Sequence, residues 1–355
     1  MYSHFLNCDW GTTNFRLRLV EVASQKIVAQ RSSPDGASSL AGASSDATRP
    51  RYFQNVLLRH VQALSQTTSI DVETLPIVIS GMASSSMGWK DLPYAETPLA
   101  IDGHQLVLSR LSDVGELTQP VYLISGVRSE SDVMRGEETE LVGLGTLHHE
   151  LFARHATTWV LLPGTHCKHV FVQRGTIVDF HTYMTGELFQ LLSEQSSLRH
   201  PELPEKSCCD WSNRQLVDAF CEGVRLAEKD GLTRSLFQVR VGQLRNGLTS
   251  AASQALLSGQ LIGSEIWSLK SQSASDAHIV LCAGRKLSVP YRMALELAGM
   301  AHRTTEISVE EVERLSAAGQ WQALNLCRQR AEEHGQAMHR PMRPSIAAAS
   351  KSNLL

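Results

Sequence analysis

The chain has 355 residues, of which 42% are hydrophobic and 19% charged, and this length is enough to bury two cores of ordinary size. A formal net charge of −3 provides no basic field for a nucleic-acid backbone, and no unbroken apolar stretch approaches the roughly 20 residues needed to span a bilayer. We therefore expect a soluble two-domain protein, with neither nucleic acid nor membrane among its partners.

The cysteines and the first residues indicate the compartment. Seven cysteines are scattered along the chain, and their odd number and spacing suit reduced thiols rather than a disulfide framework. The opening residues, MYSHFLNCDWG, lack the charged segment, long apolar stretch and small-residue cleavage site of a secretory signal. These features predict a cytoplasmic protein.

The first 31 residues predict two consecutive hairpins, because apolar runs at 4–9, 14–22 and 26–31 are separated by polar turns. The first turn reads WGTT, residues 10–13, and its glycine, backbone N–H groups and two hydroxyls suit an anionic oxygen. Asp9 ends the preceding strand and could hold a hydrated cation beside the turn. Glycine with threonine is also ordinary hairpin chemistry, so this segment alone leaves both interpretations open.

An amphipathic helix follows a loop in the first half. The loop, residues 32–45, is rich in Ser, Ala and Gly and could order over a substrate. One face of the helix is apolar and should be buried. This face carries Phe53, Val56, Leu57, His60, Val61 and Leu64.

The plan of strand, glycine–threonine turn, strand, tight turn and strand occurs a second time. The second turn reads PGTH, residues 163–166, and helical sequence follows each copy. The three expected strands cover residues 158–162, 168–173 and 176–180. Two similar domains, each offering such a turn to a cleft between them, would clamp a phosphate. The paired turns therefore favour phosphate binding over two plain hairpins.

Two further elements are expected downstream. An apolar strand that ends in Ala-Gly, residues 278–284, precedes a helix over 286–300. A helix over 254–267 carries Gly259 and Gly263 four residues apart, and this spacing favours close packing over contact with a ligand.

The C-terminal end is expected to hold one more helix and a tail. Ser308 with Glu311 forms a capping box that opens the helix. The stretch 335–355 is rich in Pro, Ser and Ala with few apolar anchors, which predicts a disordered tail.

Several motifs resemble those of a known superfamily. The first and second phosphate-binding motifs of actin-like ATPases, which include hexokinase, the heat-shock ATPase and many sugar kinases, are matched by DWGTTNFR and LPGTHCKHV. Their adenosine motif is matched by HIVLCAG, although this chain continues as RKLSVPY without a glycine triplet. The resemblance narrows to the 2-dehydro-3-deoxygalactonokinase family through SGMASSSMGWKDLPY, SGVRSESDVMRGEETELVG and DFHTYMTGEL, and it runs from about Cys8 to about Met300.

The resemblance implies an α/β fold with two similar actin-like (ribonuclease H-like) domains facing a central cleft. We expect an N-terminal domain over residues 1–155, which would hold the sugar acid and the first phosphate motif. A C-terminal domain over 156–334 would hold the second phosphate motif and the adenosine motif, with the tail at 335–355.

The implied activity is transfer of the γ-phosphoryl group of ATP, with Mg²⁺, to the 6-hydroxyl of 2-dehydro-3-deoxy-D-galactonate, a step of D-galactonate catabolism. A phosphohydrolase of the exopolyphosphatase kind and a kinase for the gluco epimer are the alternatives, and a sensor without turnover is a third class. The expected partners are therefore a keto-deoxy sugar acid and ATP. Epimer and nucleotide preference are left open, as is the oligomeric state, a homodimer included.

The resemblance also implies roles around the nucleotide. Asp9 would bind Mg²⁺ through water, and Lys168 would add positive charge. His166 could donate to a phosphate oxygen, or it could be only a cap or a packed ring. The remaining expected nucleotide contacts are Gly11, Thr12, Thr13, Gly164, Thr165 and Gly284.

A carboxylate in MRGEETELVGLG is expected to act as general base for the acceptor hydroxyl. Glu137 and Glu138 are adjacent, so on a helix they point about 100 degrees apart and only one readily faces the cleft. The catalytic glutamate of the exopolyphosphatases aligns with Glu138, which we expect to be the base, with Glu137 second and Asp132 in reserve. Both glutamates could instead cap the helix start.

The carboxylate of the sugar acid calls for guanidinium groups. Arg135, Arg128 and Arg16 are the candidates, although each could equally be structural. Loops after strands of the first domain could line the sugar pocket, and Trp89 could instead belong to the core. The candidates in these loops are Ser80, Gly81, Trp89 and Lys90.

Overall fold

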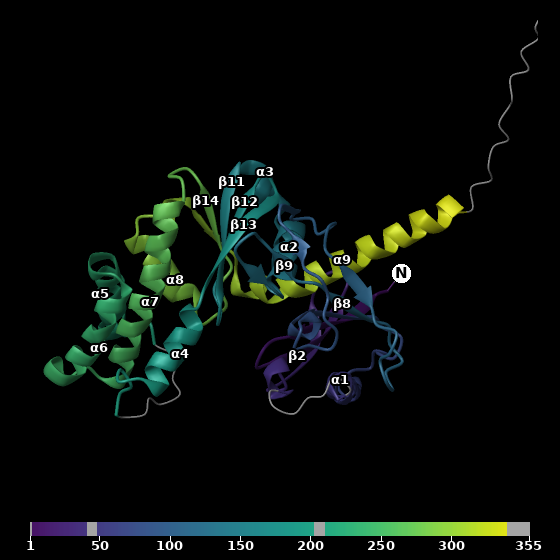
Figure 1. Cartoon of the computed structure of the whole chain (residues 1–355), viewed down its shortest axis with the longest axis horizontal. Coiled ribbons are helices and arrows are strands. Elements are labelled where there is room, and N and C mark those ends of the chain that lie inside the picture. Colours follow the sequence, from purple (N-terminus) through teal and green to yellow (C-terminus); the bar gives the residue numbers. More distant parts are fainter. Residues whose placement is uncertain (1, 41–47, 202–209, 339–355) are drawn as a thin grey trace, which may run out of the picture.

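The computed structural model describes residues 2–40, 48–201 and 210–338 (Figure 1). Two six-stranded mixed sheets form its framework. The first has the order β3-β2-β1-β4-β8-β7, in which β1, β4 and β8 run parallel and the other neighbours pair antiparallel. Its strands are β1 (His4–Trp10), β2 (Phe15–Glu21), β3 (Ile27–Ser33), β4 (Ile77–Gly81), β7 (Leu108–Arg110) and β8 (Val121–Ile124).

The second sheet has the order β15-β14-β11-β12-β13-β6. Here β11, β14 and β15 run parallel, and β11-β12-β13 form two antiparallel hairpins. Five strands thus repeat the order and direction of β3-β2-β1-β4-β8, which confirms the predicted α/β fold with two similar actin-like halves. The strands are β6 (Leu99–Ala100), β11 (Thr157–Leu162), β12 (Cys167–Gln173), β13 (Thr176–Tyr183), β14 (His278–Leu281) and β15 (Thr304–Glu306).

A small third sheet, β10-β9-β5, comes from the first half of the chain. It consists of β5 (Ala95–Glu96), β9 (Val127–Arg128) and β10 (Val133–Met134). The short strand β6 follows β5 but pairs with β13 of the second sheet, so an element from the first half completes the edge of the second.

Helices cover the sheets and link them. The face predicted for the first helix is the buried face of α1, where all six expected residues are buried. The α-helices are α1 (Arg49–Ser65), α2 (Glu137–Leu147), α3 (His149–Arg154), α4 (Thr185–Gln195), α5 (Arg214–Asp230), α6 (Leu232–Asn246), α7 (Ser250–Gln272), α8 (Ser288–Leu297) and α9 (Val309–Met338). Short 3₁₀ turns lie at Ala37–Leu40, Met82–Ser84 and Ala301–Arg303.

The helices α2 and α9 cross at very short distance between the two sheets (Figure 1). A Cβ on Gly319 of α9 would lie 1.8 Å from Thr139 O, and a Cβ on Gly143 of α2 would lie 1.9 Å from Leu315 O. The surrounding core contains residues of both sheets and both helices, such as Val78, Val160, Leu141 and Leu324. The two halves therefore share one core at this crossing.

The predicted packing role of the paired glycines is confirmed. A Cβ on Gly259 would lie 2.1 Å from Phe220 O, and one on Gly263 would lie 2.8 Å from Val224 Cα. Both glycines therefore let α7 approach α5 closely.

The predicted capping box opens α9, with Glu311 N donating to Ser308 Oγ and Ser308 N donating to Glu311 Oε2, each at 3.3 Å. The helix continues to Met338, and the rest of the predicted tail lies outside the described residues, as do residues 41–45 of the predicted loop. Within the described ranges, none of the helices combines the length and hydropathy needed to cross a bilayer.

Candidate active site

The first glycine–threonine turn lies at the end of β1 and is held by backbone contacts. Gly11 N donates to Asn14 O at 2.8 Å, which closes the hairpin to β2. Thr12 O accepts from Ser38 N at 2.9 Å and from Ser38 Oγ at 2.7 Å. Thr12 and Thr13 have exposed side chains. The loop before α1 thus supports the turn from one side, and the turn presents its threonines to solvent on the other.

Asp9 precedes this turn, and Arg16 lies opposite on β2. Arg16 Nη1 is 3.4 Å from Asp9 Oδ2, and the two side chains are 50% and 30% exposed. No group of three His, Cys, Asp or Glu side chains among the described residues could hold a metal ion. A cation at Asp9 would therefore complete its shell with water and phosphate oxygens, which is the mode that Mg²⁺ favours at nucleotide sites. The residues fit the predicted Mg²⁺ in this way.

The second glycine–threonine turn lies at the equivalent end of β11. Gly164 N lies 3.5 Å from Cys167 Sγ, and Thr165 O accepts from Glu187 N of α4 at 3.0 Å. His166 Nε2 lies 2.5 Å from Glu187 Oε2. The first turns of α4 therefore support this loop, and they give His166 a carboxylate partner within the protein. The side chains of Thr165 and His166 remain exposed.

The ends of β1 and β4 and the start of α2 meet at two glycines in the left-handed region. Gly81 has φ 92° and Gly136 has φ 115°. A Cβ on Gly81 would lie 2.5 Å from Trp10 O, and a Cβ on Gly136 would lie 3.5 Å from Gly81 Cα. Ser80 is buried, and its Oγ accepts from Gln320 Nε2 of α9 at 2.9 Å. Ser80 is thus engaged with α9, while the two glycines bring α2 against the first turn.

The adjacent glutamates at the start of α2 have different surroundings. Glu138 is completely buried, with Oε2 accepting from Gly136 N at 2.7 Å and Oε1 accepting from Thr139 Oγ1 at 3.0 Å. Burial, and then the neighbouring Glu137 carboxylate, raise the pKa of Glu138 to about 8. The Glu137 side chain is 26% exposed, and its Oε2 accepts from Arg135 N at 3.1 Å. This placement favours Glu137 over Glu138 as the group that meets a substrate hydroxyl.

Lys168 lies on β12 with only 6% of its side chain exposed. Its Nζ donates to Thr182 Oγ1 at 2.6 Å and to Val133 O at 3.2 Å, and it lies 4.0 Å from Glu137 Oε1. Burial raises the pKa of Glu137, and the Lys168 ammonium opposes that rise. Lys168 Nζ is therefore held by acceptors on β10 and β13.

Two candidates for sugar contacts lie in packed positions. Arg135 Nη1 contacts Ser84 O and donates to Ser84 Oγ at 2.8 Å, and the guanidinium lies 4.2 Å from the ring centroid of Tyr94. Trp89 is buried and stacks on Phe53 with ring centroids 6.1 Å apart. Arg135 therefore stabilises the loop after β4, and Trp89 belongs to the core. The sequence allowed both of these structural roles as alternatives to sugar binding.

The other candidates are more exposed. Arg128 pairs with Glu96 on the small sheet, beside a cavity of about 670 Å³. Lys90 is exposed, with Nζ 3.5 Å from Ser109 Oγ. The structure thus places Asp9, Arg16 and Glu137 near one another. Arg128 and Lys90 make their described contacts elsewhere, with Glu96 and Ser109.

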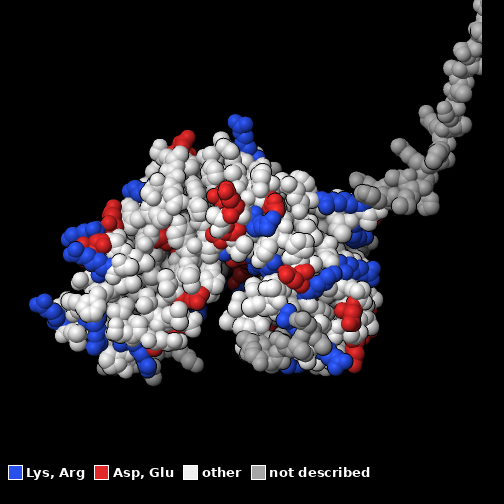
Figure 2. Space-filling model, viewed as in Figure 1, with Lys and Arg blue, Asp and Glu red and all other residues white. Residues whose placement is uncertain are grey.

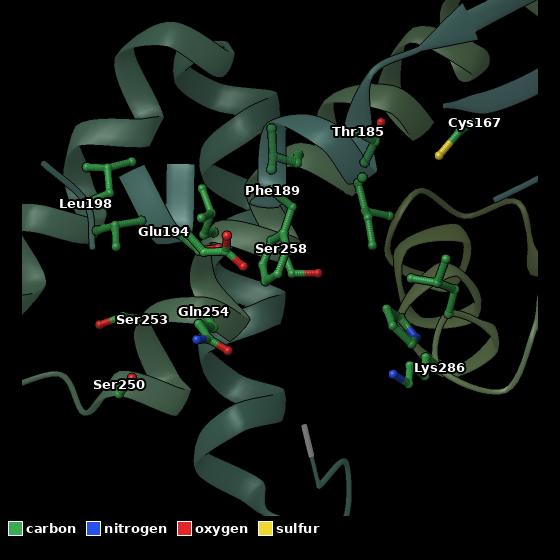
Figure 3. A pocket seen from close by; sticks show the side chains of 18 of the residues that line it. Cys167, Thr185, Phe189, Glu194, Leu198, Ser250, Ser253, Gln254, Ser258 and Lys286 are labelled. Carbon is green, nitrogen blue, oxygen red and sulfur yellow. The ribbon is translucent and has the colours of Figure 1, made fainter. Parts of the chain in front are cut away.

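A cavity of about 1340 Å³ lies beside the second turn, between α4, α7 and the start of α8 (Figure 3). Gly164 lines one end, and Lys286, which follows Gly284, lines one wall. Ser250 and Ser253 of α7 also line it, are at least nine-tenths buried, and have hydroxyls without a hydrogen-bond partner. Because an unpaired buried hydroxyl is costly, these two groups are available to bond to water or to a ligand in the cavity. Gly284 itself is exposed, and a Cβ there would meet nothing within 4 Å.

A buried polar network lies between this cavity and the second sheet. Glu265 accepts from Thr185 Oγ1 at 2.5 Å and from Tyr291 OH at 2.8 Å, and lies 2.7 Å from His169 Nε2. Cys167 Sγ lies 3.0 Å from Tyr291 OH. The network ties the second turn to α4, α7 and α8.

The two lobes leave an open hollow. Figure 2 shows the surface indented between the lobe of α4 to α7 and the lobe that carries β2 and α1. Glu137 lies between the two halves, since both Asp9 of β1 and Lys168 of β12 act on its pKa.

Sequence reasoning missed the side chains that support these groups. Ser250 and Ser253 belong to no motif, Thr182 lies in DFHTYMTGEL without having been given a role, and Glu265 lies 96 residues from its partner His169. A polar residue within the apolar sequence of the predicted helix 254–267 is the one signal that could have identified Glu265. The others become visible only when the strands are placed side by side.

Comparisons with known proteins also indicate a kinase. A model of the 2-keto-3-deoxy-galactonokinase family matches residues 9–323. The probable 2-dehydro-3-deoxygalactonokinase of Rhizobium meliloti (strain 1021) is 33% identical over 320 residues, covering 89% of this chain and 96% of the relative. The 2-dehydro-3-deoxygalactonokinase of Escherichia coli (strain K12) is 31% identical over 304 residues, covering 84% and 91%. A crystal structure from Sinorhizobium meliloti that carries the same name provisionally is 30% identical with a TM-score of 0.71, covering 90% and 96%.

Proposed function

The chain belongs to the 2-keto-3-deoxy-galactonokinase family, and from this membership we propose that it transfers the γ-phosphoryl group of ATP to the 6-hydroxyl of 2-dehydro-3-deoxy-D-galactonate. The products are ADP and 2-dehydro-3-deoxy-6-phosphogalactonate. We place the reaction in the cytoplasm, where ATP is supplied.

One observation carries the proposal beyond the family name. Two glycine–threonine turns occupy equivalent strand ends of two sheets with the same strand order, and Glu137 lies between the halves that carry them. Phosphoryl transfer depends on positioning and charge neutralisation, and paired turns can supply backbone N–H groups to the phosphates of one nucleotide. We assign the phosphates to Gly11, Thr12, Thr13, Gly164 and Thr165.

The nucleoside end of ATP fits the cavity beside the second turn. This cavity begins at Gly164 and extends to Ser250 and Ser253, whose unpaired hydroxyls would gain partners from a bound nucleoside (Figure 3). Lys286 on the opposite wall would face the bound nucleotide.

Glu137 serves as general base in the proposed reaction. Its carboxylate takes the proton of the sugar hydroxyl as the hydroxyl oxygen bonds to the γ-phosphorus, and the bond from phosphorus to the β-phosphate oxygen breaks to release ADP. Glu138 has both carboxylate oxygens in hydrogen bonds and no exposure, so it supports the start of α2. Arg16 and Arg128 keep exposed guanidinium groups and remain the candidates for the carboxylate of the sugar acid.

Mg²⁺ is proposed to bind near Asp9 through water, and its chemistry would be neutralisation of phosphate charge. Asp9→Asn should raise the Mg²⁺ concentration needed for half-maximal activity several-fold and weaken binding of MgADP in calorimetry. An unchanged Mg²⁺ requirement would place the cation elsewhere.

The direct test is a coupled ADP-release assay across keto-deoxy sugar acids, including the galacto and gluco epimers. Selective turnover of the galacto form is expected. Phosphate release in the absence of any sugar acid would favour a phosphohydrolase, and thermal stabilisation by ATP without ADP formation on any acceptor would favour a sensor.

A further inference from the structure

We propose that Lys168 is a positioning residue for the general base: it holds the Glu137 carboxylate ionised and turned toward the cleft, and it does not bind the phosphates of ATP. This inference rests on the proposed kinase function and adds to it. It reassigns the lysine that the sequence places among the phosphate contacts.

The lysine is already engaged. An ammonium group has three N–H donors. Thr182 Oγ1 and Val133 O accept two of them, at 2.6 and 3.2 Å, and the Glu137 carboxylate lies 4.0 Å away. With 6% of the side chain exposed, Nζ has little surface to offer an incoming phosphate.

Thr182, which accepts a hydrogen bond from Lys168, is itself held in place, and this fixes where the lysine ammonium lies. Thr182 Oγ1 donates to Asp132 Oδ1 at 2.9 Å, and Thr182 N donates to Asp132 Oδ2 at 2.6 Å. Because its own proton goes to Asp132, the threonine hydroxyl presents a lone pair to Lys168 Nζ. Asp132, Thr182 and Lys168 therefore form a chain of contacts that ends at Glu137.

The position of the Glu137 carboxylate agrees with this chain of contacts. Its Oε2 accepts from Arg135 N, and its Oε1 is the oxygen nearest Lys168. Among the ion pairs between described residues, Lys168 is the partner of Glu137. The carboxylate thus has one oxygen fixed to the backbone and the other beside a cation at the cleft.

The other titratable groups around Glu137 are mostly carboxyls. Asp9 on β1 acts on it from the first turn, with Arg16 of β2 bound to Asp9. Glu138 and Glu140 lie on the same helix, and burial above all, with the Glu137 charge adding to it, raises the pKa of each to about 8, so both are mostly neutral at pH 7. Burial and the Asp9 charge both oppose ionisation of Glu137, and Lys168, 4.0 Å away, is the cation placed to favour it.

The experiment compares the pH dependence of kcat/KM for the sugar acid, at saturating MgATP, in the wild type and three variants. Glu137→Gln should lose the acidic limb of the profile with most of the rate. Lys168→Met should move the acidic limb about 1–3 pH units upward, because removing an opposite charge raises a carboxyl pKa. Its kcat at neutral pH should fall at least tenfold and recover toward pH 9, with KM for ATP within twofold of the wild type. Lys229→Met, at an exposed lysine on α5, should leave the profile unchanged.

A fourth variant keeps the proposal testable if Lys168→Met does not fold. Thr182→Val keeps the lysine but removes its fixed acceptor, so the limb should move in the same direction by a smaller amount. ADP binding by calorimetry shows whether each variant is folded.

The proposal is overturned if Lys168→Met and Thr182→Val are both folded and keep the acidic limb of the wild type. It is also overturned if Lys168→Met raises KM for ATP tenfold without moving that limb, as the loss of a phosphate contact would. Either result leaves wild-type turnover, and with it the kinase function, intact. Absence of wild-type turnover would instead reject the proposed function itself.

Discussion

At the scale of single residues, Glu137 and Glu138 show how neighbours in sequence acquire different chemistry. Glu138 is enclosed and accepts hydrogen bonds from Gly136 N and Thr139 Oγ1, whereas Glu137 keeps partial exposure beside Lys168. The helix period points the two side chains in different directions, and Gly136 precedes them with φ 115°.

Glutamine substitutions at these two positions should separate catalysis from support. Glu137→Gln should lower kcat by about 10²- to 10⁴-fold, the usual value of general base catalysis, with ADP affinity retained. Glu138→Gln should cost no more than about tenfold, since one buried hydrogen bond changes at most. Steady-state kinetics and ADP titration calorimetry measure both effects. A larger loss in Glu138→Gln than in Glu137→Gln would return the base to Glu138.

The unpaired serines of the cavity lead to a second prediction at this scale. Ser253→Ala should raise KM for ATP about two- to tenfold with kcat unchanged, because a ligand hydrogen bond of about 0.5–1.5 kcal/mol is lost. Ser271→Ala is the matched control on α7, since its exposed hydroxyl already donates to Ser268 O. Equal ADP dissociation constants in the two variants would show that the nucleoside does not reach Ser253.

At the scale of elements, the sequence predicted what local periodicity encodes. Both hairpin pairs, the buried face of α1, the packing glycines of α7 and the capping box of α9 all follow from residues close together in the chain. The pairing of β6 with β13 and the crossing of α2 and α9 could not be predicted, because they join segments far apart in sequence. The same reason applies to the site: the turns were visible as motifs, but the contacts of Lys168 depend on β10, β13 and α2 meeting.

The crossing of α2 and α9 should be sensitive to a single methyl group. Gly319→Ala would place a Cβ 1.8 Å from Thr139 O, so the helices must separate. We expect the variant to lose about 1–3 kcal/mol of unfolding free energy, the usual cost of overpacking, and to show a lower Tm in scanning calorimetry. Gly284→Ala is the control, because its Cβ would meet nothing within 4 Å. A Tm equal to that of the wild type would mean that α2 and α9 can separate without loss of stability.

At the scale of the whole molecule, two halves with the same strand order share one core at α2 and α9 and separate at the hollow (Figure 2). The first half contributes Asp9 and Glu137, and the second contributes Lys168 and the cavity proposed for the nucleoside. A complete site therefore needs both halves in contact with the same ligands, and relative motion of the halves about the crossing would exclude water from the phosphoryl group.

This arrangement predicts closure that requires both substrates. Glu137→Gln is suited to the test because it should bind sugar acid and MgATP together without turning them over. Small-angle scattering should give a smaller radius of gyration for this ternary complex than for the protein alone, whereas either ligand by itself should give a smaller change. The physical reason is that MgATP would contact the turns of both halves and the sugar acid would add contacts near Glu137, so the two ligands together should draw the halves closer than either one alone. In the wild type, ATP hydrolysis without sugar acid should then be far slower than phosphoryl transfer with it, because the open cleft leaves the base and the γ-phosphoryl group apart. An unchanged radius of gyration in the ternary complex, combined with full transfer activity in the wild type, would show that the open arrangement is already competent and that no closure is needed.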